Sequence, residues 1–260
     1  MPDDMKAHTA PRMPDLGALQ PLCRLATCNG LIQLKSRYPQ YCYFERDTPN
    51  SNGWGLKQMG TLLCADRIVR SHPARVLEVG AGTNRYFDEW FGSLIEYWMI
   101  DDAGFYDTTA FQAACAKRRH TRHVQGLLGS SSSEIPDASF NMVFSISVLE
   151  HVPAPQRLAV YKDMFRILAP GGQAVHSIDL SDPESAKAHR QCLLEAGFDV
   201  PRTSDMIPCV MDLQAGPTLF EPLYLVFHDY FGKTRPDMWT NLRSVTCQYF
   251  TLLVAARRPS

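Results

Sequence analysis

The 260-residue sequence lacks the features that mark several large classes of protein. No apolar run reaches the roughly 18 residues that a membrane-spanning helix needs. The N-terminal stretch MPDDMKAHTAPRMPD is polar and has no apolar signal region. The formal net charge is −1, so no basic field attracts phosphate backbones. We therefore expect a cytoplasmic protein that neither enters a membrane nor binds nucleic acid.

The eight cysteines include no C-x-x-C pair, which argues against a zinc knuckle or a redox dithiol. Free cysteines are among the most buried residues, and we expect ordinary buried thiols here. His120 and His123 have a spacing seen in metal ligands, but no carboxylate or thiol flanks them. A solvated loop is the better interpretation, and the sequence predicts no metal site.

What the sequence does contain is a regular alternation of short apolar strands with helices of ten to fifteen residues. A first helix begins near Leu56 and ends before Pro73. We expect strands at 75–80, 96–100, 123–128, 140–148, 173–180 and 247–258, and helices at 87–95, 107–119, 153–168 and 185–198. This alternation predicts a parallel sheet that is covered by helices on both faces.

Residues 1–55 differ from the rest of the chain and are expected to form a separate cap or lid. Residues 15–34 can form one or two short helices, and residues 38–55 are aromatic and rich in turns. The aromatic side chains are either a lid over a bound molecule or a cap on the core: Tyr38, Tyr41, Tyr43, Phe44 and Trp54. The main domain is expected at 56–260, with an insertion at about 205–243 before the last strand.

The first strand leads into a glycine turn, in the sequence RVLEVGAGTNR. Gly80 and Gly82 allow close approach of a ligand to the backbone, although two such glycines alone often mark only a tight turn. Arg85 stands where a dinucleotide fingerprint has its third glycine, and Glu78 precedes the turn. A carboxylate there disfavours a pyrophosphate and favours a ligand that carries an amino group.

A second acidic position follows one strand later. Asp101 and Asp102 lie about twenty residues beyond Gly82, where a carboxylate at a strand end can accept both hydroxyls of a ribose. The alternative is an aspartate that caps a helix or a turn. The spacing and the position at the strand end favour ribose binding.

The motifs VLEVGAGTNR, MIDD, DASFNMVFSISVLEHV and RILAPGGQAVHSIDL resemble, in order and spacing, the class I S-adenosylmethionine-dependent methyltransferases. The resemblance covers roughly residues 56–200 and is closest to the group with LEH after the fourth strand. It implies a Rossmann-like, seven-stranded, mostly parallel sheet with helices on both faces and an antiparallel last strand. The N-terminal segment would be a helical cap, and the cofactor would be S-adenosyl-L-methionine.

The resemblance also implies roles for particular residues. The glycine turn would approach the methionine part of the cofactor, Glu78 its amino group, and Asp101 or Asp102 the ribose. Leu127 and Leu128 replace a frequent acid and would hold the adenine by apolar contact, while Asn141 replaces a frequent aspartate. The implied cofactor residues are Glu78, Gly80, Ala81, Gly82, Asn84, Asp101, Asp102, Leu127, Leu128 and Ser145.

Three residues are candidates for catalysis, each with a structural alternative. His151 lies after the fourth strand and could be a base or a cap of the next helix; Asp179 ends the fifth strand and could also be a cap. His228 lies in the late insertion, which either encloses the acceptor or only covers the core. We expect methyl transfer to oxygen or nitrogen of a small molecule. The alternatives are a protein or RNA methyltransferase, a cofactor-binding protein with other chemistry, and a nicotinamide-dependent oxidoreductase.

Overall fold

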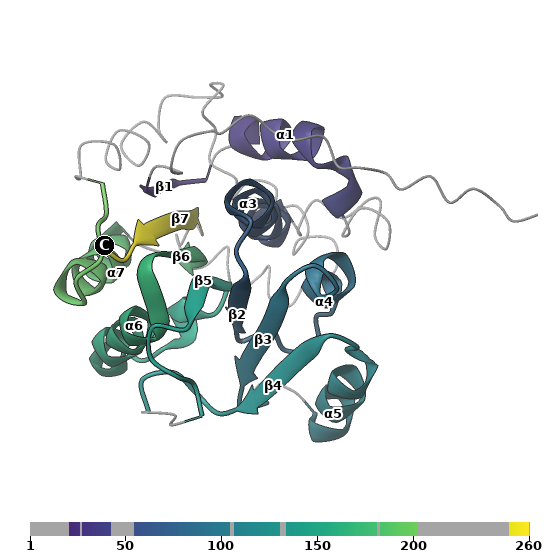
Figure 1. Ribbon diagram of the computed structural model, residues 1–260. Coiled ribbons are helices and arrows are strands. Elements are labelled where there is room, and N and C mark those ends of the chain that lie inside the picture. Colours follow the sequence, from purple (N-terminus) through teal and green to yellow (C-terminus); the bar gives the residue numbers. More distant parts are fainter. Residues whose placement is uncertain are drawn as a thin grey trace, which may run out of the picture.

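A computed structural model describes residues 21–26, 28–42, 55–104, 107–130, 134–180, 183–201 and 250–259. Seven strands form one sheet in the order β1-β7-β6-β5-β2-β3-β4 (Figure 1). The strands are β1 (Leu22–Leu25), β2 (Arg75–Val79), β3 (Glu96–Asp101), β4 (Thr121–Gln125), β5 (Phe140–Ile146), β6 (Leu168–Leu180) and β7 (Phe250–Arg257). The late insertion at 205–243, with His228, and the aromatic residues Tyr43, Phe44 and Trp54 lie outside the described residues.

The sheet is parallel from β6 through β5, β2 and β3 to β4, and β7 runs antiparallel to β6. This confirms the predicted mostly parallel sheet with an antiparallel last strand. The strand order reverses between β2 and β5, since the chain goes from β2 outward to β3 and β4 before it returns to β5. In a sheet of this kind ligands bind at the carboxyl ends of the strands beside that reversal.

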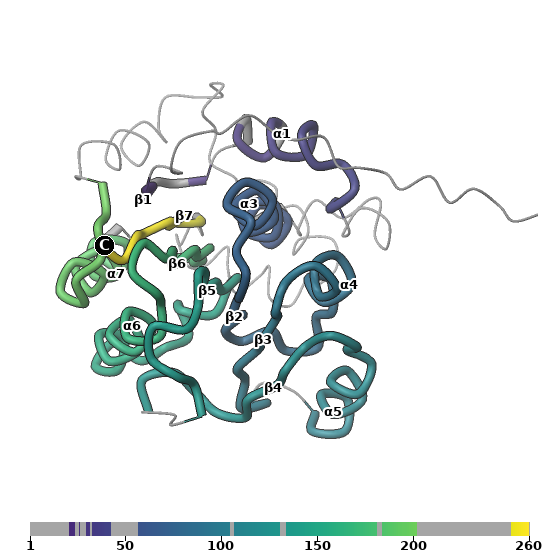
Figure 2. Tube along the Cα trace, in the orientation of Figure 1, coloured from purple at the N-terminus to yellow at the C-terminus, as the bar shows by residue number. Residues whose placement is uncertain are grey.

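Helices cover both faces of the sheet, as Figures 1 and 2 show. The helices are α1 (Cys28–Arg37), α3 (Gly55–Ser71), α4 (Tyr86–Phe91), α5 (Thr108–Lys117), α6 (Ala154–Ile167) and α7 (Pro183–Glu195), with short turns η1 (Pro39–Tyr41) and η3 (Leu149–His151). One core joins α6 and α7 to one face, and another joins α3 and α4 to the opposite face. Residues alternate between these cores along the strands: Leu77 packs in the first and Val76 in the second. None of the described helices is long and apolar enough to cross a membrane.

The N-terminal segment both caps and extends the sheet. Helix α1 packs against α3, but residues 22–25 form strand β1, where the sequence pattern predicted helix. β1 pairs antiparallel with β7, with Cys23 opposite Val254. Because β7 is buried along nearly its whole length, its outer edge would otherwise leave backbone N–H and C=O groups unpaired. The need to pair that edge explains why this short segment is extended.

Several element boundaries differ from the predicted ones: β4 is observed at Thr121–Gln125 where 123–128 was predicted, and α4 and β6 differ for identifiable reasons. α4 ends at Phe91 because Gly92 and the following turn interrupt it, whereas the sequence pattern predicted a helix to residue 95. β6 begins at Leu168 and includes the APGG sequence that was expected to be a loop. Its first residue pairs with Phe140, and an irregularity in the register follows before Met142 pairs with Gln173. The glycines therefore lie in a bulged start of the strand.

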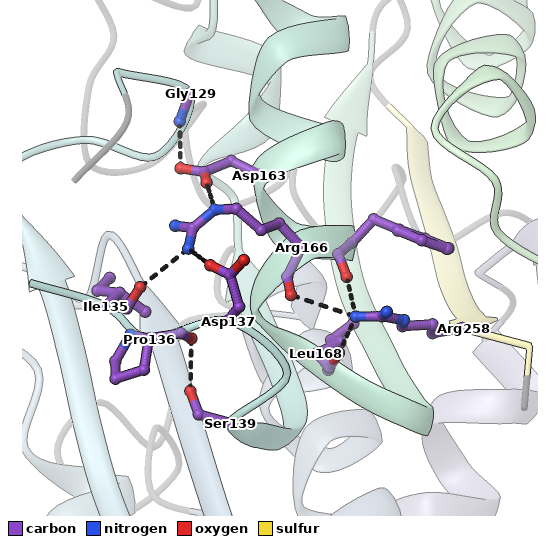
Figure 3. Close-up of polar contacts among 10 residues, drawn as sticks. Gly129, Ile135, Pro136, Asp137, Ser139, Asp163, Arg166, Leu168 and Arg258 are labelled. Atoms are coloured by element: carbon purple, nitrogen blue, oxygen red, sulfur yellow. Dashed lines mark hydrogen bonds and ion pairs between the residues drawn. The ribbon is translucent and has the colours of Figure 1, made fainter. Parts of the chain in front are cut away.

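A polar network fixes the segment that follows β4 (Figure 3). The Asp163 carboxylate on α6 accepts the backbone N–H of Gly129 at 2.9 Å and the Arg166 guanidinium at 2.7 Å. Arg166 also donates to the carbonyl of Ile135 at 3.0 Å and forms an ion pair with Asp137. Gly129 has a φ of +86°, and a Cβ there would lie 2.9 Å from the backbone nitrogen of Val160. Gly129, which ends the segment after β4, is thus held close to α6.

Candidate cofactor and acceptor site

A cavity of about 550 Å³ opens at the carboxyl ends of β2, β3 and β5, beside the reversal of strand order. Its wall contains most of the cofactor residues expected from the sequence, together with one catalytic candidate: Glu78, Gly80, Ala81, Asn84, Asp101, Asp102, Leu127, Leu128 and His151. The structure therefore brings together residues from the glycine turn, the end of β3, the segment after β4 and the η3 turn. Gly82 and Ser145 are not part of the wall.

The glycine turn has a backbone that requires glycine at two positions. Gly80 and Gly82 have φ angles of +69° and +55°, in the left-handed region that side chains disfavour. A Cβ on Gly80 would lie 2.7 Å from a Val148 methyl group. The Gly80 N–H donates to the carbonyl of Ile100 at 2.9 Å, which ties the turn to β3. The bare backbone of the turn therefore faces both the cavity and the end of β5.

Glu78 is a buried acid that faces this cavity. Only 4% of the residue is exposed, and the Tyr97 hydroxyl on β3 donates a hydrogen bond to its carboxylate. Burial raises the pKa of Glu78 from 4.5 to about 7, while the Tyr97 hydrogen bond and the charge of Arg118 oppose the rise. A cationic partner would recover the cost of ionising this carboxyl, so the site suits a ligand with an ammonium group.

The two aspartates at the end of β3 have different surroundings. The Asp101 carboxylate is buried and accepts the N–H groups of Gly82 and Ala103, both at 2.8 Å. Asp102 is exposed, and its carboxylate accepts the N–H of Gly104 at 2.9 Å. Both residues line the cavity. Asp101 therefore shapes the glycine turn, and Asp102 has the more accessible carboxylate.

The segment after β4 presents an apolar surface to the cavity. Leu127 is 55% exposed and Leu128 is buried, and both line the wall. A large exposed apolar side chain in a cavity wall offers an apolar contact surface for an aromatic base. Ser145, by contrast, is fully buried, and its hydroxyl lies 2.8 Å from Nδ1 of His176, on the face of the sheet that packs against α6.

Asn141 lies at the opposite end of β5 from the cavity. Its side-chain oxygen accepts the backbone N–H groups of Ala74 and Arg75, both at 3.0 Å, and so fixes the start of β2. A carboxylate could accept the same two bonds, so asparagine can fill the role of an aspartate there. The departure from the family pattern at this position does not touch the cavity.

Two of the catalytic candidates, His151 and Asp179, are among the described residues, and both lie near η3. His151 lines the cavity, and 55% of its side chain is exposed. Asp179 ends β6, and its carboxylate accepts the Thr251 hydroxyl at 2.8 Å. Between them lies Glu150, whose carboxylate approaches Nε2 of His151 at 4.0 Å. Burial and the charge of Asp179 raise the pKa of Glu150 to about 8. The triplet LEH thus supplies two ionisable groups, of which the sequence analysis had considered only the histidine.

Helix α3 supplies wall residues that the sequence analysis missed. Lys57 and Thr61 line the cavity, and nothing in their spacing distinguishes them from other residues of an amphipathic helix. A further connection comes from the N-terminal segment, because Tyr41 packs on Trp90 at 4.9 Å between ring centroids. Trp90 stacks on Tyr86, another wall residue, at 5.7 Å. Tyr38 instead packs in the core, where its hydroxyl donates to Asp66 at 2.9 Å.

Comparisons with known proteins concern the domain and its fold. Residues 77–176 match a family model described as a methyltransferase domain. The solved structure of the 4+2 cyclase SpnF matches with a TM-score of 0.56 and 16% identity, over 92% of this chain and 99% of that chain. A candidate sarcosine dimethylglycine methyltransferase from Galdieria sulphuraria matches with a TM-score of 0.52 and 14% identity, over 78% of this chain and 88% of that chain.

No curated protein matches the chain at a significant level. The identities to the two solved structures are low, so these similarities concern the fold, and the family model adds the nature of the domain. Residues 77–176 thus match a methyltransferase domain, and the chain shares the fold of these two solved structures, in agreement with the sequence motifs.

Proposed function

We propose that the protein transfers a methyl group from S-adenosyl-L-methionine to an oxygen or nitrogen atom of a small molecule in the cytoplasm. The observation that carries the proposal is the arrangement of Glu78, the glycine turn and the two aspartates around one cavity. The buried carboxyl suits an ammonium group, and the backbone without side chains suits a methionine chain. The acid at the strand end suits a ribose.

The residues present fit this cofactor from end to end. Glu78 is positioned to receive the amino group, because an ammonium ion would stabilise its ionised form. Asp102 would accept the ribose hydroxyls, because its carboxylate is the more accessible one, while Asp101 holds the turn through the Gly82 N–H. Leu127 is positioned to contact the adenine ring. The chemistry that the cofactor supplies is a methyl group on a sulfonium, and the chain has to align the acceptor with it and exclude water.

The acceptor would enter between α3 and η3, where Lys57, Thr61 and His151 line the same cavity. An alcohol or a protonated amine must lose a proton during transfer, and His151 is an accessible base at this position. Glu150 lies beside it, with its carboxylate 4.0 Å from Nε2 of His151. A small acceptor is favoured because the cavity holds about 550 Å³, and the net charge of −1 gives no support to an RNA substrate.

A second candidate function is chemistry other than methyl transfer in the same cavity. The structure is similar to that of a cyclase over nearly the whole chain, and one fold can host different reactions. This similarity supports the second candidate function. In that case the cofactor would bind while its methyl group stays in place.

A screen with methyl-labelled S-adenosylmethionine and a pool of small metabolites tests both proposals. Incorporation of label by the native protein, and its loss in a His151→Ala variant that still binds S-adenosylhomocysteine, is the result expected for a methyltransferase that uses His151 as its base. Binding of the cofactor without label transfer to any fraction would favour the second candidate. Label transfer to RNA or to protein instead would refute the small-molecule acceptor.

A further inference from the structure

The basic sequence KRRHTRH, residues 117–123, contains one arginine that does not face solvent like its neighbours. Arg119 and Arg122 are exposed, whereas Arg118 is half-buried and reaches under the glycine turn. Nη2 of Arg118 donates to the carbonyl of Gly82 at 2.7 Å and to that of Asn84 at 2.5 Å. Its Nε donates to the same Asn84 carbonyl at 3.2 Å. The Arg118 side chain thus links the end of α5 to the backbone carbonyls of the glycine turn.

The turn is therefore held by two opposite charges. The N–H of Gly82 donates to the Asp101 carboxylate, and the C=O of Gly82 accepts from the Arg118 guanidinium. Hydrogen bonds to charged groups contribute more than bonds between neutral groups. Because Gly82 has a left-handed backbone and no side chain, these two bonds to its peptide groups substitute for the packing that normally fixes a loop. The shape of the turn therefore depends on these two bonds.

We propose that Arg118 is a positioning residue for the glycine turn, which it holds in the shape that receives the amino-acid part of the ligand. The inference rests on the proposed function only for the identity of that ligand. The charge of Arg118 acts in the same direction, since it favours the ionised form of Glu78 across the turn. Arg118 itself is not part of the cavity wall, so it acts through Gly82 and Asn84 and not by contact.

The first test needs no ligand and compares Arg118→Ala with Arg119→Ala by hydrogen exchange. Arg119 is the neighbouring arginine with an exposed side chain, which makes it a matched control. We expect the amides of residues 80–86 to exchange at least about tenfold faster in Arg118→Ala, because the turn loses bonds to a charged group. Amides of β5 and β6 should be unchanged. Unchanged exchange at 80–86 in the folded Arg118→Ala protein would overturn the inference.

The second test measures two ligands by calorimetry. S-adenosylhomocysteine has the amino-acid part, and 5′-methylthioadenosine lacks it. In Arg118→Ala we expect affinity for S-adenosylhomocysteine to fall by about tenfold or more, and affinity for methylthioadenosine by less than about threefold. Arg118→Lys, which keeps the charge with fewer donors, should lie between the native protein and Arg118→Ala. An equal loss for both ligands would show that Arg118 only stabilises the fold and would overturn the inference. Failure of the native protein to bind S-adenosylhomocysteine would refute the proposed function instead, and hydrogen exchange would still decide the role of Arg118.

Discussion

Replacing Glu78 with glutamine should make the protein more stable and its cofactor binding weaker. The pKa of Glu78 rises from 4.5 to about 7 on folding, mainly because the carboxyl is buried. Below pH 4.5 the carboxyl is protonated in both folded and unfolded states, and it has no effect on the pH dependence of stability. Between pH 4.5 and 7 the folded state holds its proton more tightly, so native stability falls as the pH rises. Above pH 7, the buried Glu78 carboxylate lowers the free energy of unfolding by about 3 kcal/mol relative to its value below pH 4.5.

Glutamine has the same shape, can still accept the Tyr97 hydroxyl and does not ionise. Urea unfolding at pH 5, 6, 7 and 8 measures the free energy of unfolding of both proteins, and the difference between them removes the titration of all other groups. As the pH rises, we expect the free energy of unfolding of the glutamine variant to increase relative to that of the native protein, by up to about 3 kcal/mol. Glu134→Gln, at an exposed position, should show no such gain. Parallel pH profiles for native protein and Glu78→Gln would refute the reasoning.

The same variant should lose about tenfold in affinity for S-adenosylhomocysteine at pH 8, because a neutral amide replaces a charge-assisted partner of the ammonium group. Calorimetry at this pH measures the loss. A gain in stability together with a loss in affinity is the pattern expected of a residue kept for binding. An affinity equal to that of the native protein would place the amino group elsewhere.

Three further predictions concern the turn and the η3 region. Gly80→Ala should abolish binding of S-adenosylhomocysteine in calorimetry, because φ is +69° and the new Cβ would meet Val148 at 2.7 Å; retained affinity would contradict the placement of the turn. His151→Ala should lower kcat for the identified acceptor by about a hundredfold or more while leaving cofactor affinity within twofold; equal kcat would remove His151 as the base. Glu150→Gln should reduce the fall in the free energy of unfolding between pH 4.5 and 8, since the pKa of Glu150 in the folded state is raised to about 8. If urea unfolding shows the same pH dependence in the variant and the native protein, Glu150 does not have this raised pKa.

The sheet could be predicted from the sequence because its central strands are buried on both faces. RVLEV and FNMVFSI are nearly continuous apolar segments, and the helices between them have the length of crossover connections. The glycine turn was also predictable, since its two left-handed residues accept few residues other than glycine. In contrast, β1 depends on the unpaired edge of β7, more than 220 residues away along the chain, and no local pattern reveals it.

The cofactor end of the site was predicted better than the acceptor end, for a physical reason. Glu78 and Asp101 lie beside strand ends, and a sequence pattern locates strand ends. Lys57 and Thr61 reach the cavity only because α3 packs across the sheet, and Arg118 reaches the turn only because α5 ends beneath it. These relations depend on packing between elements, which the sequence of one element does not contain. Ser145 has the right position along β5, but its side chain points to the face that packs on α6.

The central claim is that the cavity receives a nucleoside that carries an amino acid and not a dinucleotide. Calorimetry of the native protein with S-adenosylhomocysteine and, separately, with NAD tests it most directly. The account predicts one molecule of S-adenosylhomocysteine bound per chain, with no heat of binding for NAD. Binding of NAD without binding of S-adenosylhomocysteine would contradict it.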